Sequence, residues 1–180
     1  TGVQTCALPI FHIDPRAKWS DGKPVLAEDV KWTFDTVMDP ASDAGSYYGL
    51  FSQYESPEVI DERTVRFRLK DGIPDDWRAF MNAGMFEIMP KHAFEDKRFA
   101  ALDLKDAVVS GPYRLARVDE HKRAVFERRK DWWRIDMVEE RGHYNFDKIE
   151  MKYYADNENA FEAFKKDELD LYPVYTAHIM

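Results

Sequence analysis

The sequence predicts a mixed α+β fold, and three observations predict it. Several short segments alternate apolar and polar residues, as strands with one buried face do. Other segments repeat apolar residues at the spacing of a helix. The last part of the chain reads as strand, helix and strand, an order that implies a right-handed crossover. Since no internal repeat or low-complexity tract is present, we expect one mixed set of helices and strands.

The first elements expected are a strand over Phe11–Ile13 and, after a loop over Asp14–Pro24, a helix over Ala27–Met38. The helix is predicted because apolar residues recur in it every three or four positions. Two carboxylates in its first turn suit the helix dipole. Leu26 stands in the N-cap position, where its side chain cannot accept a hydrogen bond, so we expect a weak cap.

The middle of the chain predicts a hairpin and two further helical segments. Thr64–Lys70 alternates cleanly, and Tyr54–Ile60 is its expected antiparallel partner across a turn. The elements expected next are a helix over Asp75–Ala83, a short apolar segment over Phe86–Met89 and a helical turn over Pro90–Phe94.

The C-terminal part predicts a second hairpin and the strand–helix–strand unit. The hairpin joins Pro112–Val118 to Lys122–Arg128, and the unit consists of a strand over Asp147–Tyr154, a helix over Asn157–Lys166 capped by Asp156 or Asn157, and a strand over Leu169–Tyr172. The residues expected in the core are Val30, Phe34, Val65, Phe67, Leu69, Tyr113, Ile149, Met151, Phe161 and Phe164.

Length and composition exclude several classes of protein. A chain of 180 residues can bury a real core, and 14% aromatic residues are too many for a disordered segment. No run of about 18 apolar residues occurs, so the chain encodes no transmembrane helix. The net charge of −8 argues against a nucleic-acid partner. Residues 119–134 are locally basic and end near Trp132, but interleaved carboxylates favour a solvated hairpin face there over a nucleic-acid surface.

Residues 1–10 are interpreted as a non-native segment that resembles translated adapter sequence. The alternative is a native strand end that uses Ile10. The single cysteine, Cys6, lies in this segment, so the rest of the chain has none. This fits an oxidising compartment without requiring one. The absence of a visible signal peptide says nothing, because we expect the true N-terminus to be missing.

Searches for catalytic and metal motifs find nothing, so we expect no catalytic residue, no metal and no cofactor. The nucleophile-elbow, zinc-protease, dinucleotide and phosphate-loop patterns are all absent. Glu140 and His143 have the spacing of two ligands on a helix, but the flanking sequence is loop-like and a polar surface loop is the better interpretation. Many carboxylates remain, and because sequence alone cannot pair them, a hydrolase that uses two carboxylates stays open as the alternative function.

The segment Ser46–Phe51 is small and aromatic and suits the wall of a ligand groove. Peptide backbones and apolar side chains bind well to rigid aromatic walls with a few polar tips. On this basis Tyr47 and Tyr48 are candidate ligand-binding residues. The alternative is that Tyr48, Phe51 and Tyr54 are core residues.

Four short segments in a fixed order are the most specific feature of the chain. They are Trp19–Val30 (WSDGKPVLAEDV), Ser110–Tyr113 (SGPY), Asp131–Trp133 (DWW) and Phe161–Asp170 (FEAFKKDELD). Together they resemble the signatures of the family 5 extracellular solute-binding proteins, the peptide- and nickel-binding group that serves ABC importers. Val109 and Asp167 stand where the family has glycine, and Asp tolerates the left-handed backbone expected there. Residues 141–149 and 153–156 further resemble the Yej-type branch, associated with peptide and microcin C uptake.

The resemblance implies a mixed-sheet lobe of a type II periplasmic-binding-protein fold, incomplete in this chain. Residues 11–173 would form part of the first lobe, and residues 174–180 would start the crossover to a second lobe that is missing. The implied function is the substrate-binding component of an ABC importer, which captures peptides or peptide-like solutes in the periplasm. Its partners would be the permease subunits, with the membrane contacted only through the transporter. The stretch around Asn82, Met85 and Phe86 joins Tyr47 and Tyr48 as candidate ligand-binding residues.

Overall fold

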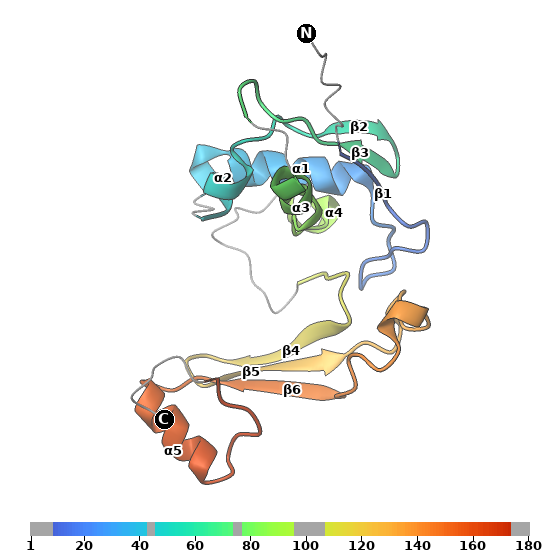
Figure 1. Cartoon of the computed structure of the whole chain (residues 1–180). Coiled ribbons are helices and arrows are strands. Elements are labelled where there is room, and N and C mark those ends of the chain that lie inside the picture. The colour runs from blue at the N-terminus through green and yellow to red at the C-terminus, as the bar shows by residue number, and fades with distance from the viewer. Residues whose placement is uncertain (1–8, 43–45, 74–76, 96–106, 174–180) are drawn as a thin grey trace.

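The computed structural model describes residues 9–42, 46–73, 77–95 and 107–173, and in them the chain forms two three-stranded antiparallel sheets with helices (Figure 1). The first sheet has the order β1-β3-β2 and the second the order β4-β5-β6. The strands are β1 (Ile10–His12), β2 (Glu58–Asp61), β3 (Thr64–Arg66), β4 (Tyr113–Asp119), β5 (Arg123–Arg128) and β6 (Lys148–Lys152). The helices are α1 (Ala27–Met38), α2 (Ser46–Phe51), α3 (Trp77–Gly84), α4 (Lys91–Phe94) and α5 (Asn157–Lys165), with short 3₁₀ turns at Pro40–Ser42 and Val138–Glu140. The mixed α+β prediction is confirmed.

The core of the first part is an aromatic cluster centred on Phe67, whose side chain is 1% exposed. Its ring meets those of Phe11, Phe34 and Tyr54 edge to face, with centroids 5.8 to 6.2 Å apart. Such edge-on contacts add stabilisation beyond the apolar area that the rings bury. Helix α1 lies against this cluster with the apolar face that its sequence spacing predicts. Of the expected core residues, Val30, Phe34, Val65 and Phe67 are buried and Leu69 is partly buried against them.

The carboxylate of Asp29 joins three segments of the first part, and it is only 4% exposed. Its Oδ2 accepts hydrogen bonds from the indole N–H of Trp19 at 3.1 Å and from the backbone N–H of Leu26 at 2.9 Å. Its Oδ1 accepts the backbone N–H of Lys91, at the start of α4, at 2.9 Å. Leu26 makes no side-chain cap, as expected, and Asp29 compensates by binding the Leu26 N–H from inside the helix.

Thr33 continues this connection one turn further along α1. Its hydroxyl donates to the Asp29 carbonyl at 2.7 Å and accepts the backbone N–H of Met89 at 2.9 Å. The segment before α4 therefore docks on α1 through polar atoms of two successive turns. A further contact joins the Trp19 loop to α4 at the surface, where Asp21 Oδ2 lies 2.6 Å from His92 Nε2.

The second sheet confirms the predicted hairpin and its neighbouring strand. Strands β4 and β5 pair antiparallel with a bulge between Leu115 and Arg117, and β5 pairs antiparallel with β6. Of the two residues expected as the cap of α5, Asp156 and Asn157, Asp156 caps the helix by accepting the backbone N–H of Asn159 at 2.7 Å. Asp167 follows the helix at φ 58°, the left-handed conformation that the sequence suggests for this position.

Three of the expected core residues are instead exposed in the second part: Ile149 by 37%, Met151 by 53% and Phe164 by 38%. The core prediction is wrong for Ile149 and Met151 because β6 is an edge strand and no described residue covers its apolar face. It is wrong for Phe164 because this side chain of α5 meets only the ring of Tyr172 among the described aromatic residues. The alternation of apolar and polar residues predicts which side chains share a face of a sheet. Whether that face is buried depends on other elements that pack against it. Tyr113 and Phe161 are partly buried.

The strand predicted over Leu169–Tyr172 is not formed. A strand needs the backbone of a neighbouring strand, and no described segment pairs with these residues. Leu171 is 83% exposed, and the Tyr172 ring packs on those of Phe161 and Phe164 at 5.6 and 6.1 Å. The first hairpin is also shorter than expected, with Tyr54 and Leu69 joined only by an isolated bridge. Helix α3 is described from Trp77, and α2 has no counterpart among the expected elements.

Arg129 holds the segment that leads into the second sheet, with a side chain 3% exposed. Its Nη1 donates to the carbonyls of Val109 and Gly111 at 3.2 and 3.1 Å, and its backbone N–H donates to that of Pro112 at 2.7 Å. Trp132 Nε1 donates to the carbonyl of Ser110 at 2.9 Å, so each of the four successive carbonyls from Val109 to Pro112 accepts a hydrogen bond. The two motifs of the sequence, SGPY and DWW, are therefore two sides of one hydrogen-bonded junction.

The same junction reaches the first part through Ser20. The backbone N–H of Ser20 donates to the Val109 carbonyl at 2.7 Å, and the Val109 N–H donates to the Ser20 hydroxyl at 3.1 Å. A small apolar cluster around buried Trp19 packs beside it, with Val108 and Trp133 from the second part.

We predict that Asp29→Asn destabilises the protein by about 2–3 kcal/mol, because an amide cannot accept all three N–H groups and leaves a buried donor unpaired. Urea unfolding followed by tryptophan fluorescence measures the loss. Glu28→Gln is the matched control, since Glu28 is exposed and only its pairing with Lys91 is lost. Equal stability of the two variants would show that the Asp29 junction does not hold the fold.

We also predict that Arg129→Met costs about 2–3 kcal/mol, because the Val109 and Gly111 carbonyls lose a charged donor. Arg128→Met is the control: Arg128 pairs with exposed Asp147, and its loss should cost below about 1 kcal/mol. Urea titration of both variants compares them. A larger loss for Arg128→Met than for Arg129→Met would contradict the proposed role of the junction.

Candidate functional site

The candidate ligand-binding residues lie on α2 and at the end of α3, two helices that are in contact. Tyr48, on α2, is 47% exposed, and Met85, directly after α3, is 70% exposed. Asn82 is half-buried on α3. The side chain of Tyr47 lies outside the described residues. Tyr48 and Met85 therefore offer surface to a ligand, while Asn82 offers part of its amide.

Phe86 lies on the other side of this surface, against the aromatic core. Its ring centroid is 4.6 Å from that of Phe51 and 6.0 Å from that of Phe34. Phe51 and Tyr54 are each 1% exposed, so the core interpretation holds for these two residues and not for Tyr48. Phe86 thus packs between the aromatic core and the two helices, and it presents little of its own surface.

Helix α3 adds an apolar row that the sequence reasoning missed. Trp77, Phe80 and Met81 are 70%, 55% and 47% exposed, and with Met85 they follow the spacing of one helix face. Ala83, on the opposite face, is buried, and the Phe80 ring stacks on Phe11 at 5.9 Å. The spacing is visible in the sequence, but it does not reveal which face of the helix meets the core.

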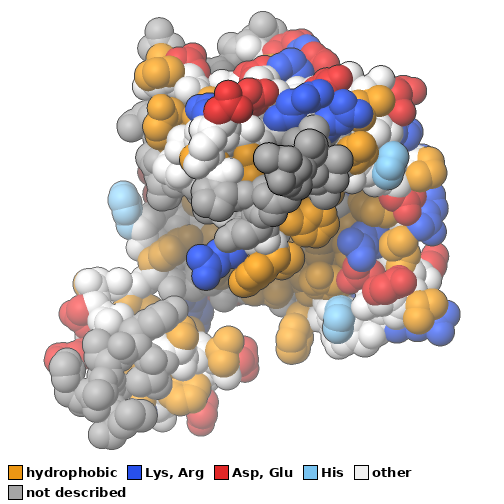
Figure 2. All heavy atoms as spheres, turned by 45° about the horizontal axis from the view of Figure 1, so that its top comes forward, with side chains coloured by type: hydrophobic (Ala, Val, Ile, Leu, Met, Phe, Trp, Pro, Cys, Tyr) orange, Lys and Arg blue, Asp and Glu red, His pale blue; other side chains and the backbone are white. Residues whose placement is uncertain are grey.

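We call Tyr48, Trp77, Phe80, Met81 and Met85 the apolar wall. Aromatic rings supply rigid contact area, and methionine adapts its shape to different partners. Figure 2 shows hydrophobic side chains gathered at the edge of the hollow beside the projecting part that carries α5. None of the five side chains of the wall is charged. The charged group beside them is Arg78, whose guanidinium lies 6.0 Å from the Trp77 ring centroid.

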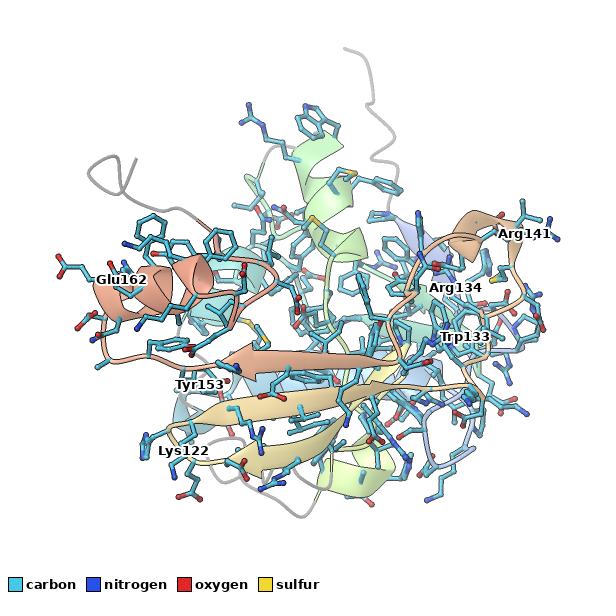
Figure 3. The ribbon with its side chains drawn as sticks, turned by 90° about the horizontal axis from the view of Figure 1, so that it is seen from below. Lys122, Trp133, Arg134, Arg141, Tyr153 and Glu162 are labelled. Carbon is cyan, nitrogen blue, oxygen red and sulfur yellow. The ribbon has the colours of Figure 1, made fainter. Side chains whose placement is uncertain are left out.

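A depression of about 680 Å³ lies at the other end of the molecule, where β4, β5 and β6 meet the Asp119–Arg123 turn. Its two arginines are paired within the depression: Asp119 accepts from Arg117 and Arg123 at 2.7 Å each, and Arg123 reaches Glu150 at 3.1 Å. The ammonium group of Lys152 donates to the Glu168 carbonyl at 2.9 Å. The hydrogen bond from Arg123 is the main cause of a lowered pKa of Asp119, and the hydrogen bond from Arg117 adds to it. Figure 3 shows Lys122 and Tyr153 at this end of the sheet. The arrangement fits the solvated hairpin face expected for the basic stretch.

The Glu140–His143 pair is part of an ion cluster. Glu140 Oε1 lies 2.5 Å from Arg134 Nη2, and Oε2 lies 3.9 Å from His143 Nδ1. The Arg134 guanidinium also lies over the Trp133 ring, 5.6 Å from its centroid (Figure 3). Within the described part of the chain, no group of three or more His, Cys, Asp or Glu side chains could hold a metal ion.

The carboxylates give no support to general acid chemistry. Hydrogen bonds from the Arg16 side chain and backbone lower the pKa of Asp14 to about 2. The pKa of Glu58 is lowered by Arg68, and that of Asp131 by Arg129. A hydrolase with two carboxylates needs one of them held protonated by a raised pKa. Wherever a shift is resolved for an Asp or Glu of the described residues, it goes the other way.

Among residues 9–42, 46–73, 77–95 and 107–173, no helix is long and apolar enough to cross a membrane.

Comparison with known proteins identifies relatives over nearly the whole chain. The peptidoglycan-binding protein YepA of Agrobacterium fabrum is 35% identical over 163 residues, which are 91% of this chain and 26% of that protein. YejA of Escherichia coli is 31% identical over 159 residues, 88% of this chain and 25% of the relative. The chain therefore spans about a quarter of the length of the relatives that it matches.

Solved structures show the same fold. The oligopeptide-binding protein AppA of Bacillus subtilis, in complex with a nonapeptide, superposes with a TM-score of 0.73 at 19% identity, covering 94% of this chain and 32% of AppA. A periplasmic oligopeptide-binding protein of Thermotoga maritima superposes with a TM-score of 0.67 at 28% identity, covering 89% and 29% of the two chains. The predicted fold, an incomplete lobe of the type II periplasmic-binding-protein kind, is confirmed.

The family model of the bacterial extracellular solute-binding proteins, family 5, matches residues 10–180. The resemblance inferred from the four sequence segments is confirmed, and the chain belongs to the family 5 bacterial extracellular solute-binding proteins.

Proposed function

We propose that the chain is part of the substrate-binding component of an ABC importer that captures peptides or peptide-like solutes in the periplasm and delivers them to the permease. The observation that carries this proposal is the family match over residues 10–180. A relative named as a probable peptide-binding protein, YejA of Agrobacterium fabrum, supports the ligand class. The residues of this chain would supply one side of the ligand site, because they cover about a quarter of such a relative.

The apolar wall is the part of the chain that we assign to the ligand. A peptide presents side chains of many shapes, and a wall of aromatic and thioether groups can contact them without demanding one shape. None of the five side chains of the wall is a carboxylate, so the wall itself offers no charged partner to the amino group of a peptide. Tyr48 and Asn82 are the candidates for polar contacts to the peptide backbone, because each combines a polar tip with partial exposure.

We propose that the protein binds its solute without chemical conversion. The alternative, a hydrolase with two carboxylates, lacks an observation in its favour: the resolved pKa shifts of Asp and Glu in the described residues favour the ionised forms. Paired cations hold these carboxylates in surface ion pairs instead.

We predict that Met85→Ala in the whole receptor weakens the binding of tripeptides by about tenfold, because the exposed thioether loses its contact with the ligand. Tyr48→Ala should act in the same direction. Isothermal titration calorimetry against a library of tripeptides measures the change. Val138→Ala is the matched control, since Val138 is 68% exposed but lies on the short turn before Arg141, away from α2 and α3.

The 180-residue chain by itself should bind the same tripeptides at least about a hundredfold more weakly than the whole receptor, because one wall leaves much of the ligand in water. Comparable affinity of the chain and the receptor would show that these residues form a complete site. Affinity unchanged by both wall substitutions would remove the apolar wall from the ligand site.

A further inference from the structure

An irregular segment, residues 86–90, joins the apolar wall to α1, and we call it the support segment. It runs from the end of α3 to the start of α4 and follows Met85 of the wall directly. Helix α1 contacts α2 and α4, and α2 contacts α3, so the two wall helices and α1 belong to one packed group (Figure 1). Whatever holds the support segment against α1 also holds the end of α3 that leads into Met85.

The support segment forms no helix or strand, so individual hydrogen bonds hold its backbone. At its start, the Phe86 N–H donates to the Ala83 carbonyl over 3.4 Å, which is long for such a bond. Near its end, the Met89 N–H donates to the Thr33 hydroxyl over 2.9 Å, and the Met89 carbonyl lies 3.2 Å from the same hydroxyl. Both backbone polar groups of Met89 therefore meet one side chain of α1.

The Thr33 hydroxyl is well suited to this contact. Its side chain is 1% exposed, so water does not compete for the hydroxyl. The hydroxyl proton is directed to the Asp29 carbonyl, at 2.7 Å the nearer of two acceptors, which leaves the oxygen lone pairs for the Met89 N–H. A methyl group in place of the hydroxyl would leave that N–H without its acceptor in a partly buried place, and the support segment would have to move to satisfy it.

The support segment reaches both helices of the wall. Met85, directly before it, continues the last turn of α3 by donating its N–H to the Met81 carbonyl at 3.0 Å. Phe86 packs its ring on that of Phe51, the last residue of α2, with centroids 4.6 Å apart. A shift of the support segment therefore displaces Met85 directly and displaces the helix of Tyr48 through this ring contact.

We propose that Thr33 is a positioning residue of the ligand site: its buried hydroxyl fixes the support segment and thereby the places of Met85 and Tyr48. The inference rests on the proposed function, which assigns the apolar wall to the ligand. Because Thr33 lies inside the protein, it acts through these residues and not by contact with the ligand. Asp29, one turn earlier on α1, binds the Lys91 N–H and so holds α4 instead.

Thr33→Val keeps the shape of the side chain and removes the hydroxyl. In the whole receptor it should weaken the binding of tripeptides about tenfold, whereas Thr33→Ser, which keeps the hydroxyl, should stay within about twofold of the unmodified receptor. Thr36→Val is the matched control, since Thr36 is half-buried on the same helix and its hydroxyl binds no described residue. Calorimetric titration with a library of tripeptides measures the affinities, at a temperature where circular dichroism shows every variant folded. Unchanged affinity of Thr33→Val, or an equal loss in Thr36→Val, would overturn the proposal.

A double-mutant cycle separates positioning of the wall from a general structural role. Substitutions that act independently have additive effects, whereas a residue that acts through a second one loses its effect once the second is removed. Thr33→Val should therefore weaken binding by about threefold or less in a receptor that already carries Met85→Ala. A loss of about tenfold in that background as well would make Thr33 a structural residue only, against the proposal.

The methyl signal of Met85 tests the positioning without any ligand. In the ligand-free whole receptor with isotope-labelled methionine methyl groups, Thr33→Val should move or broaden this signal, and Thr36→Val should leave it in place. A Met85→Leu variant assigns the signal. If the unmodified receptor binds no tripeptide, the proposed function fails, and the methyl signal still decides whether Thr33 holds the wall. An unchanged Met85 signal in Thr33→Val would refute the positioning role in either case.

Discussion

The buried carboxylate of Asp29 is the interaction on which the first part of the structure depends. One side chain accepts N–H groups from the Trp19 loop, from the entry of α1 and from the start of α4. These segments are up to 72 positions apart in sequence, from Trp19 to Lys91. A buried carboxylate without donors would be costly, so its position is compatible with only one arrangement of the three segments. The same requirement explains the length of the motif Trp19–Val30, which begins at the residue that donates the indole N–H and ends one residue after Asp29, which accepts it.

The second part follows the same principle with the opposite charge. The buried guanidinium of Arg129 and the indole of Trp132 bind three successive carbonyls of the segment that precedes β4. Ser20 then joins this segment to the loop that Trp19 belongs to. Two buried charged side chains, each bonded mainly to backbone groups, thus hold the loop, the connecting segment and the second sheet together. The family motifs in this chain are positions of structural hydrogen bonding, and the proposed ligand contacts lie elsewhere.

Function in this proposal comes from the surface that these junctions leave open. The aromatic core around Phe67 supports α2 and α3 from behind, through Phe51 and Phe86, and the outer sides of the two helices carry the apolar wall. A rigid support under adaptable methionine and tyrosine side chains suits a receptor that must accept ligands of varied shape.

The sequence by itself determined the elements that local interactions stabilise. The bounds of α1, the second hairpin, a cap of α5 at Asp156 or Asn157 and the left-handed Asp167 all follow from spacing and capping within a few residues, and the four motifs were enough to indicate the family. For the candidate site, the sequence indicated the right segments but could not separate exposed Tyr48 and Met85 from Phe86, which packs on the core. Only the tertiary structure decided that separation, the exposed face of α3, the uncovered Ile149 and Met151, and the absence of a strand over Leu169–Tyr172. The physical reason is that burial and strand pairing need partners distant in the chain, and an apolar residue type states what can be buried without stating what covers it.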